Sequence, residues 1–265
     1  FSPALAAFGD WLEQLIAEST GKEGRGIVPV VGEPPGAPDV YGDDRVFVHL
    51  CIEGEGGEEE PLERLARAGQ PVLRICLRDR YDLGGQIFLW ETATAAAGHL
   101  LGINPFDQPD VEAAKVLARG IISRYVEQGR LPPEAPAISA EGIDVYGDVK
   151  AQGPGDALNA FLDHARPGSY VALQAYLEPR PGTDEALANL RCRLRDRRHL
   201  VTTAGYGPRY LHSTGQLHKG DAGRGLFIQF TTDDRRDVPI PDEMGPSGSS
   251  VTFGVLKAAQ AMGDR

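Results

Sequence analysis

The sequence predicts a doubly wound α/β fold built on one mainly parallel sheet of five or six strands. Short apolar runs alternate with segments of helical periodicity, several of these runs look buried on both faces, and each lies near a helical segment. The order strand, helix, strand indicates right-handed crossovers. With 265 residues, of which 41% are hydrophobic, the chain is long enough for a substantial core.

The first part of the chain begins with an amphipathic helix. Apolar residues recur at helical spacing from Leu5 to Ile16, which predicts a helix over residues 4–19 with Gly21 as its C-cap. The run at 26–32 predicts a strand, which Pro29 places at a sheet edge. The following segments predict a strand at 45–52, a helix at 60–68, a strand at 71–77 and a long helix at 83–101.

The second part of the chain continues the alternation after an interruption. A helix is expected at 109–128, and the Pro- and Gly-rich stretch at 129–154 predicts a linker or an insertion. The remaining segments predict a helix at 156–165, a strand at 170–176, a helix at 183–195, strands at 199–203 and 226–232, a loop at 233–250 and a closing helix at 251–262.

Charge and hydropathy exclude several classes of partner. The net charge of -11 and the pI of about 5.0 disfavour nucleic acid and anionic membranes. An anionic metabolite remains compatible, because a few cations and helix N-termini can form a local positive site. No apolar run approaches the roughly 20 residues that span a bilayer. Residues 1–3 show neither a basic leader nor an initiator Met, which indicates a fragment or a processed chain.

The three cysteines are scattered and odd in number. Cys51 and Cys76 lie in apolar runs, so we expect buried thiols in a reducing compartment, and hence a cytoplasmic protein; Cys192 stands apart. No zinc-ligand spacing and no complete nucleotide-binding glycine motif occurs. The sequence therefore predicts neither a metal nor a cofactor.

The segment 104–112 runs straight into a helix that carries Lys115. Asp107 is a candidate N-cap, and Pro109 falls near the first helical position, where its missing N–H costs nothing. This arrangement places the amide of Gln108 at a helix mouth, with a cation one or two turns behind it. It suits a polar ligand with negative charge; the alternative is an ordinary capped helix with a solvated lysine.

Gln14 and Glu18 lie four residues apart on one face of the first predicted helix. Glu18 falls near the C-terminus of this helix, where the negative end of the helix dipole favours the protonated form of a carboxylate. Such a group suits proton abstraction near neutral pH. The alternative is a surface glutamate beside a helix C-cap.

A third segment, 205–216, follows a predicted strand and should open a helix. That position corresponds to the carboxyl edge of an open α/β sheet, where ligands bind. His212 could act there as an acid or base, and Arg209 could bind a phosphate through two hydrogen bonds. The alternative is a Gly-rich turn with Ser213 as a cap and a hydrogen-bonded histidine.

Together these three segments resemble the phosphoglucose isomerase family. Residues 18–22 (E-S-T-G-K), 104–115 (N-P-F-D-Q-P-D-V-E-A-A-K) and 211–216 (L-H-S-T-G-Q) match its glutamate, lysine and histidine motifs. The chain looks closest to the isomerase half of bifunctional transaldolase/glucose-6-phosphate isomerase proteins, and the resemblance covers nearly its whole length. It implies an SIS-type (flavodoxin-like) sandwich and the isomerisation of glucose 6-phosphate and fructose 6-phosphate through a cis-enediol.

The resemblance also implies roles for individual residues. Glu18 matches the base that moves a proton between C1 and C2, and Gln14 matches a substrate-contacting glutamine. Gln108 and Lys115 match the residues that hold the ring oxygen and hydroxyls, and His212 matches the histidine that assists ring opening. In the family this histidine comes from a neighbouring subunit, so a homodimer is expected. The chemistry needs one carboxylate base and positioned donors, without metal or nucleotide.

Two departures from the family pattern shape the interpretation. The histidine motif follows the lysine motif here, whereas it precedes it in ordinary members. The Ser/Thr-rich phosphate loops of a first SIS subdomain and a G-G-R motif are not found, so the whole chain, residues 1–265, resembles the second, C-terminal SIS subdomain. Two alternatives stay open: a non-catalytic sugar-phosphate-binding module, and a structural domain that docks on transaldolase.

Overall fold

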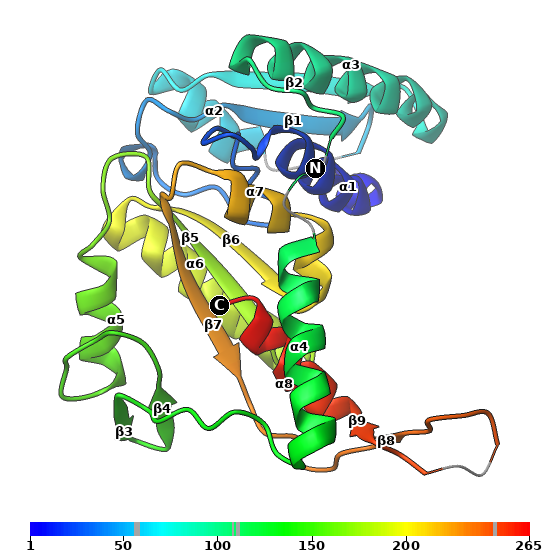
Figure 1. Cartoon of the computed structure of the whole chain (residues 1–265). Coiled ribbons are helices and arrows are strands. Elements are labelled where there is room, and N and C mark those ends of the chain that lie inside the picture. The colour runs from blue at the N-terminus through cyan, green and yellow to red at the C-terminus, as the bar shows by residue number, and fades with distance from the viewer. Residues whose placement is uncertain (56–58, 108, 110–111, 246–247) are drawn as a thin grey trace. The chain divides into compact units, whose positions relative to one another are not determined.

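We describe the protein from a computed structural model, which covers residues 1–55, 59–107, 109, 112–245 and 248–265 (Figure 1). The chain folds as two compact units. The first combines Phe1–Val111 with Val171–Phe230, and the second combines Glu112–Tyr170 with Thr231–Arg265. Helices and strands alternate along the chain and at least one strand pair is parallel, so the α/β class predicted from the sequence is confirmed.

The first unit holds most of the helices and strands. One end residue each of β5 and β7 belongs to the second unit. Its helices are α1 (Ala6–Thr20), α2 (Glu59–Arg67), α3 (Leu83–Leu101), α6 (Pro181–Arg198) and α7 (Gly215–Gly220). Its strands are β1 (Phe47–Ile52), β2 (Val72–Leu77), β5 (Tyr170–Tyr176), β6 (Val201–Tyr206) and β7 (Gly225–Thr231). Its 3-10 turns are η1 (Pro3–Leu5), η2 (Pro38–Val40), η3 (Arg80–Asp82) and η4 (Arg209–His212).

The pairing of the strands differs from the single sheet predicted from the sequence. Among the described residues, the strands form four separate sheets, ordered β1-β2, β3-β4, β6-β5-β7 and β8-β9. Apolar periodicity identifies which segments become strands but carries no information about which strands become neighbours. The strand segments were therefore largely predicted correctly, whereas their assembly into one sheet of five or six strands was wrong.

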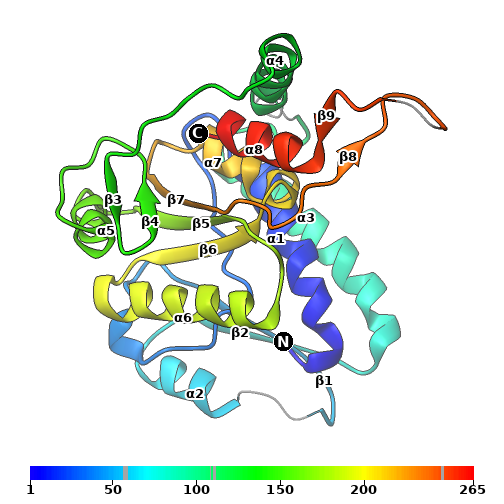
Figure 2. The ribbon, with the colours of Figure 1, turned by 90° about the horizontal axis from the view of Figure 1, so that it is seen from below.

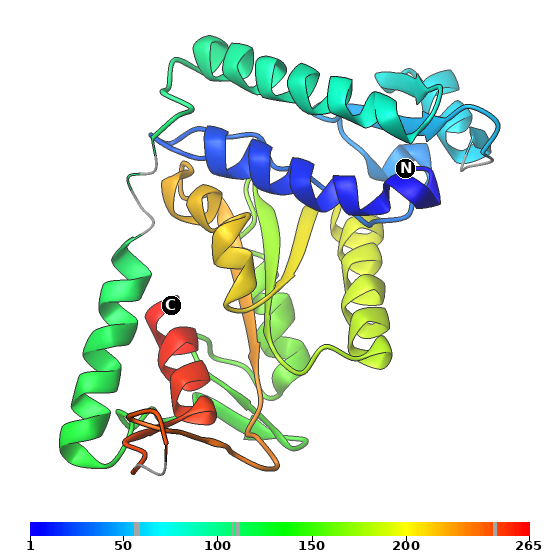
Figure 3. The same ribbon diagram turned by 90° about the vertical axis from the view of Figure 1, so that its right-hand side faces the viewer.

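Helices α1 and α3 and the pair β1-β2 share one hydrophobic core, and α1 and α3 run side by side (Figure 3). The buried Ser2 extends the pairing at β1: its N–H donates to the Leu50 carbonyl (2.9 Å), and its hydroxyl accepts from the N–H of Ile52 (3.0 Å). The buried members of this core are Leu5, Phe8, Leu12, Leu50, Ile52 and Leu77. Three of these residues, Leu5, Phe8 and Leu12, come from α1 and the 3-10 turn η1 that precedes it, so apolar burial fixes the position of α1 against the sheet.

Strand β5 is the central strand of the second sheet of this unit, and every one of its residues is buried. Helix α6 lies along β6 (Figure 2). The strand expected at 26–32 does not form, which corrects that prediction. Pro29 lacks the N–H that pairing with a neighbouring strand needs, and Gly32 has a positive φ of 68°. In addition, the Arg191 guanidinium of α6 donates a hydrogen bond of 2.9 Å to the Val31 carbonyl.

The second unit contains α4 (Glu112–Gln128), β3 (Ile138–Ala140), β4 (Ile143–Val145), α5 (Pro154–Leu162), β8 (Pro239–Ile240), β9 (Val251–Thr252) and α8 (Phe253–Gly263). The stretch predicted as a linker or insertion includes the antiparallel hairpin β3-β4, whose turn residues Glu141 and Gly142 both have positive φ. Helices α4 and α8 pack against each other, and Gly263 permits this contact because a Cβ there would lie 3.0 Å from the Ala114 carbonyl oxygen.

The cysteines depart from the sequence-based expectation. Cys51 and Cys76 are register partners on the parallel strands β1 and β2, with Cα atoms 4.5 Å apart, and they form a disulfide. The expectation of two buried thiols was therefore wrong, because it considered each apolar run separately and not the register that brings them together. Cys192 is a free cysteine. The argument from reduced thiols to a reducing compartment thus loses its basis.

No helix in the described part of the chain combines the length and the apolar character that a membrane span requires.

Candidate active site

Glu18 of the first motif and Gln14, one turn before it, lie on the last turns of α1. The amide of Gln14 donates to a carboxylate oxygen of Glu18 at 3.2 Å, which orients the carboxylate. The predicted C-cap at Gly21 is confirmed, since its N–H donates to the Ala17 carbonyl at 3.0 Å. The Thr20 hydroxyl donates to the Ile16 carbonyl at 2.7 Å. Glu18 therefore extends from a helix end whose last turn is held by the hydrogen bonds of Thr20 and Gly21.

A hollow of about 250 Å³ lies at this face of α1. It is lined by Trp11, Gln14, Leu15, Glu18 and Ser19 of α1, by Glu91 of α3 and by Pro105. None of these described lining residues is a Lys or Arg. Carboxylates and an amide can accept and donate hydrogen bonds to hydroxyl groups, and the apolar surfaces of Trp11 and Leu15 can pack against C–H groups. The hollow suits a neutral polyhydroxyl ligand or the uncharged end of a larger one.

Lys22, the last residue of the first motif, connects it to the second motif. Its ammonium donates to the backbone carbonyl of Asp107 and to the carboxylate of Asp107, the latter at 3.0 Å. The Lys22 side chain is 1% exposed and the Asp107 side chain 51%. Asp107 thus pairs with Lys22; the helix start that it was predicted to cap includes residues 108, 110 and 111, which lie outside the described residues, and α4 is described from Glu112 on. The residue types alone gave no signal for this pair, because lysine is usually exposed.

The third motif packs on the same helix end. The Gln216 amide donates to the Gly21 carbonyl at 3.0 Å, and the N–H of Gly24 donates to the Gly220 carbonyl at 2.8 Å. A Cβ on Gly21 would lie 2.2 Å from the Cα of Leu217, so this approach requires glycine. As Figure 3 shows, α7 lies beside α1. The end of α1 thus contacts residues of both other motifs.

Arg209 and His212 lie on η4, which follows β6 as predicted, but neither lines the hollow. The Arg209 side chain is 83% exposed, and its guanidinium lies 3.7 Å from the Asp10 carboxylate on α1. The Ser213 hydroxyl donates to the Tyr210 carbonyl at 3.2 Å. Burial raises the pKa of Glu13 above its ordinary value, and hydrogen bonding to Ser213 opposes that shift. His212 is exposed. The structure therefore places Arg209 beside Asp10 of α1, and neither candidate among the residues that line the hollow at Glu18.

The remaining candidates fall elsewhere. Lys115 lies half-buried on α4, which belongs to the second unit, and Gln108 lies outside the described residues. His218, beside the third motif, is packed between the rings of Tyr210 and Phe227, with ring centroids 5.9 and 5.2 Å away. Burial lowers the pKa of His218 to about 3, so its imidazole is neutral near pH 7.

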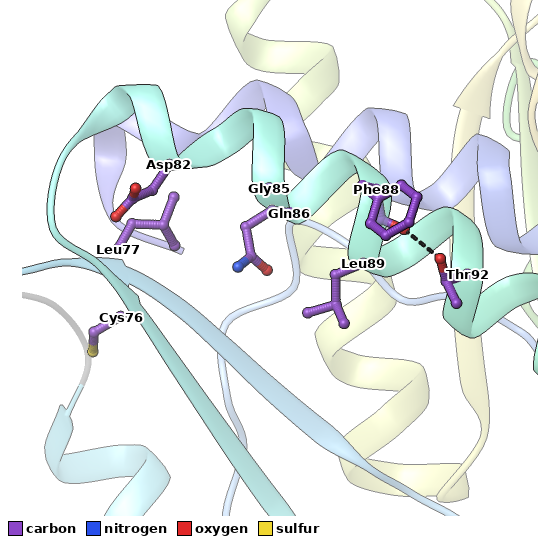
Figure 4. A pocket seen from close by; sticks show the side chains of 8 residues that line it. All are labelled: Cys76, Leu77, Asp82, Gly85, Gln86, Phe88, Leu89 and Thr92. Carbon is purple, nitrogen blue, oxygen red and sulfur yellow. Dashed lines mark hydrogen bonds between the residues drawn. The ribbon is translucent and has the colours of Figure 1, made fainter.

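A second hollow, of about 470 Å³, lies where β2 meets α3 (Figure 4). It is lined by Cys76, Leu77, Asp82, Gly85, Gln86, Phe88, Leu89 and Thr92. Its carboxylate, Asp82, is held by Arg78 through two guanidinium bonds of 2.9 and 3.1 Å, and this pairing lowers the pKa of Asp82. None of the residues predicted from the sequence as site residues lines it. The hollow at Glu18 is therefore the better candidate for an active site.

No group of three or more His, Cys, Asp or Glu side chains within the described ranges is arranged to hold a metal ion. The described hollow at Glu18 presents two carboxylates, an amide and a hydroxyl, all of which suit hydrogen bonding to a ligand.

Comparison with known proteins supports the motif-based resemblance. The chain is similar to glucose-6-phosphate isomerases of Lactobacillus helveticus (28% identity over 162 residues, 47% of this chain and 36% of that protein) and Pediococcus pentosaceus (31% over 153 residues, 43% and 34%). One from Bacillus thuringiensis is 30% identical over 153 residues. The resemblance to the phosphoglucose isomerase family is thus confirmed, over 43–47% of the chain and not over nearly its whole length as expected.

The chain spans about a third of the length of these curated relatives. No family model matches the chain, and no solved structure matches it.

Proposed function

We propose that this chain is the part of a glucose-6-phosphate isomerase that carries the base, and that Glu18 is that base. The observation that carries this proposal is the hollow in which Glu18, oriented by Gln14, faces Pro105 of the second motif. Lys22 and Gln216 tie the same helix end to the second and third motifs. The names of the relatives supply the reaction.

The chemistry of such a site is a proton transfer between adjacent carbons. In the open-chain aldose, the Glu18 carboxylate removes the proton from C2 while the C1 oxygen takes a proton from water, which gives a cis-enediol. The 2-hydroxyl then gives its proton to water and Glu18 returns its proton to C1, which leaves the ketose. The Gln14 amide, 3.2 Å from the carboxylate, keeps it in one orientation for both steps.

The proposal assigns the charged end of the substrate to groups outside the hollow. None of its described lining residues is cationic, so the sugar carbons enter it and the phosphate faces away. We propose Arg209 as a phosphate contact, Gln108 and Lys115 as contacts to the ring oxygen and hydroxyls, and His212 as the group that assists ring opening. These roles come from the family resemblance and from the chemistry of the side chains.

The wider context follows from the same resemblance. An SIS-type sandwich, a homodimer in which His212 reaches a neighbouring site, and a transaldolase fused to or docked on the chain all belong to this proposal. So does a cytoplasmic location, which suits the proposed place of the reaction in glycolysis and gluconeogenesis.

The test is interconversion of glucose 6-phosphate and fructose 6-phosphate by the purified chain and by Glu18→Gln, with deuterium uptake from D₂O as a second readout. We expect Glu18→Gln to lose turnover by a factor of about 10² or more, because general-base catalysis contributes on that scale. Glu185→Gln, at an exposed position on α6, is the matched control. Equal turnover in the wild type and Glu18→Gln would refute the assignment.

A non-catalytic sugar-phosphate-binding module is the alternative. It is favoured by the lack of a cation among the described lining residues of the hollow at Glu18. Calorimetric titration with fructose 6-phosphate distinguishes the two. Binding that Glu18→Gln leaves intact, together with no turnover by the wild type under any condition, would establish the module.

A further inference from the structure

Lys22 is buried to a degree that is unusual for a lysine. Its exposed fraction is 0%, and its ammonium meets Asp107 at two atoms, the backbone carbonyl and a carboxylate oxygen. Fully buried lysines are rare unless they are paired. Because both the main chain and the side chain of Asp107 are engaged, the contact fixes the position of this residue and not merely its charge.

The loop that Lys22 holds is also attached to α3. The N–H of Ile103 donates to the Gly98 carbonyl at 3.0 Å, and Pro105 packs on Gly98, where a Cβ would lie 2.8 Å from the proline ring. The loop therefore has one anchor on α3 and one at the end of α1. Between these anchors Pro105 forms a wall of the hollow that contains Glu18.

The pair of the buried Lys22 ammonium with the half-exposed Asp107 carboxylate is a weak source of stability, because desolvation of the ammonium offsets its attraction to a solvent-screened partner. An apolar side chain of similar length would fill the same space without that penalty. The directional hold on Asp107 is what an apolar side chain could not supply. The ammonium is therefore better explained by the geometry that it fixes than by the stability that it adds.

We propose that Lys22 is a positioning residue of the Glu18 site: by holding Asp107 it keeps the 103–107 loop, and with it Pro105, at the distance from Glu18 that the sugar requires. The reactive role of that site rests on the proposed function. Lys22 itself touches neither substrate nor reacting atoms in this scheme.

The test compares Lys22→Met, which keeps the aliphatic stem, with Lys150→Met, which changes an exposed lysine of the second unit. We expect faster hydrogen–deuterium exchange in peptides covering 103–107 for Lys22→Met alone. Its melting temperature should stay at or above that of the wild type. Turnover of glucose 6-phosphate should fall by about 10- to 100-fold, the scale of a shift of up to 1 Å in bound geometry.

Asp107→Asn supplies a second measurement, because it keeps the backbone contact and removes only the carboxylate. We expect a smaller loss of turnover than in Lys22→Met, and no additional loss of turnover when the two changes are combined. Unchanged exchange at 103–107 in Lys22→Met would overturn the proposal. So would a lowered melting temperature with faster exchange throughout the first unit, since that result marks a purely structural role.

The exchange measurement also separates this proposal from the proposed function. If the wild-type chain shows no turnover, the assignment of an isomerase activity fails. The comparison of exchange at 103–107 still decides whether Lys22 holds the loop.

Discussion

Replacing Gly21 by alanine should separate the first and third motifs. Gly21 ends α1 with φ of -77°, a value that any residue adopts, so backbone strain plays no part. The consequence comes from contact alone. The new Cβ would lie 2.2 Å from the Cα and 2.7 Å from the N of Leu217, both backbone atoms of α7 that cannot rotate away.

The magnitude follows from what must move. Non-bonded carbon atoms approach to about 3.5–4.0 Å, so α7 must retreat by more than 1 Å. That retreat stretches the 3.0 Å bond from Gln216 to the Gly21 carbonyl and the 2.8 Å bond from Gly24 to Gly220. Overpacking costs about 1–3 kcal/mol and each lost hydrogen bond about 0.5–1.5 kcal/mol, so we expect a loss of about 2–6 kcal/mol in unfolding free energy.

The assay is urea denaturation followed by tryptophan fluorescence. Both tryptophans of the chain, Trp11 and Trp90, lie in the first unit, so the signal reports the unit that is changed. Gly84→Ala is the control, because Gly84 is exposed on α3 and a Cβ there meets nothing within 4 Å. A Gly21→Ala variant as stable as Gly84→Ala would refute the close approach of α7 to the end of α1.

Three further predictions concern redox state and pH. When the chain is denatured without reductant, mass spectrometry should find alkylation at Cys192 alone. Reducing the Cys51–Cys76 disulfide, which links residues 25 positions apart, should lower the unfolding free energy by about 3 kcal/mol. Because burial lowers the pKa of His218 to about 3, this histidine becomes protonated in the unfolded chain at a higher pH than in the folded chain. Stability should therefore fall between pH 6.5 and 3 by at most about 1.4 kcal/mol per pH unit, a slope absent from His218→Phe in urea titrations. Burial raises the pKa of Glu13 above 4.5, so its contribution to the unfolding free energy is full below pH 4.5 and is lost as the pH rises through the raised pKa. In the same assay, the stability of Glu13→Gln relative to the wild type should therefore increase between pH 4.5 and 7.

Local sequence signals predicted several elements at their observed bounds. The long apolar segment gave α3 at 83–101, and the buried run gave β5 at 170–176. In both cases the signal is local: Gly102, with φ of 71°, ends α3 in the left-handed conformation, and the β5 run carries apolar residues on both faces. Such features depend on residues within the element and can be recognised without knowing its neighbours.

The errors share the opposite cause. Pairing Cys51 with Cys76 depends on the register of two strands separated by a helix. The pair Lys22–Asp107 joins residues 85 positions apart. Each outcome is decided by a partner distant in sequence, which periodicity and local propensity do not specify.

The distribution of charge around α1 separates chemistry from affinity at the proposed site. The hollow presents Glu18 and Glu91, and two carboxylates disfavour a phosphate by direct repulsion. Arg209, the phosphate contact of the proposal, lies 3.7 Å from Asp10 and outside the hollow. Binding energy for the phosphate must then come from groups that do not contact the reacting carbons, while Glu18 and Gln14 act on the carbons alone. It follows that Glu18→Gln should lower turnover without weakening the binding of fructose 6-phosphate, whereas Arg209→Gln should weaken binding. Weaker binding in Glu18→Gln, measured by calorimetry, would show that the carboxylate also holds the ground-state sugar and that this division is wrong.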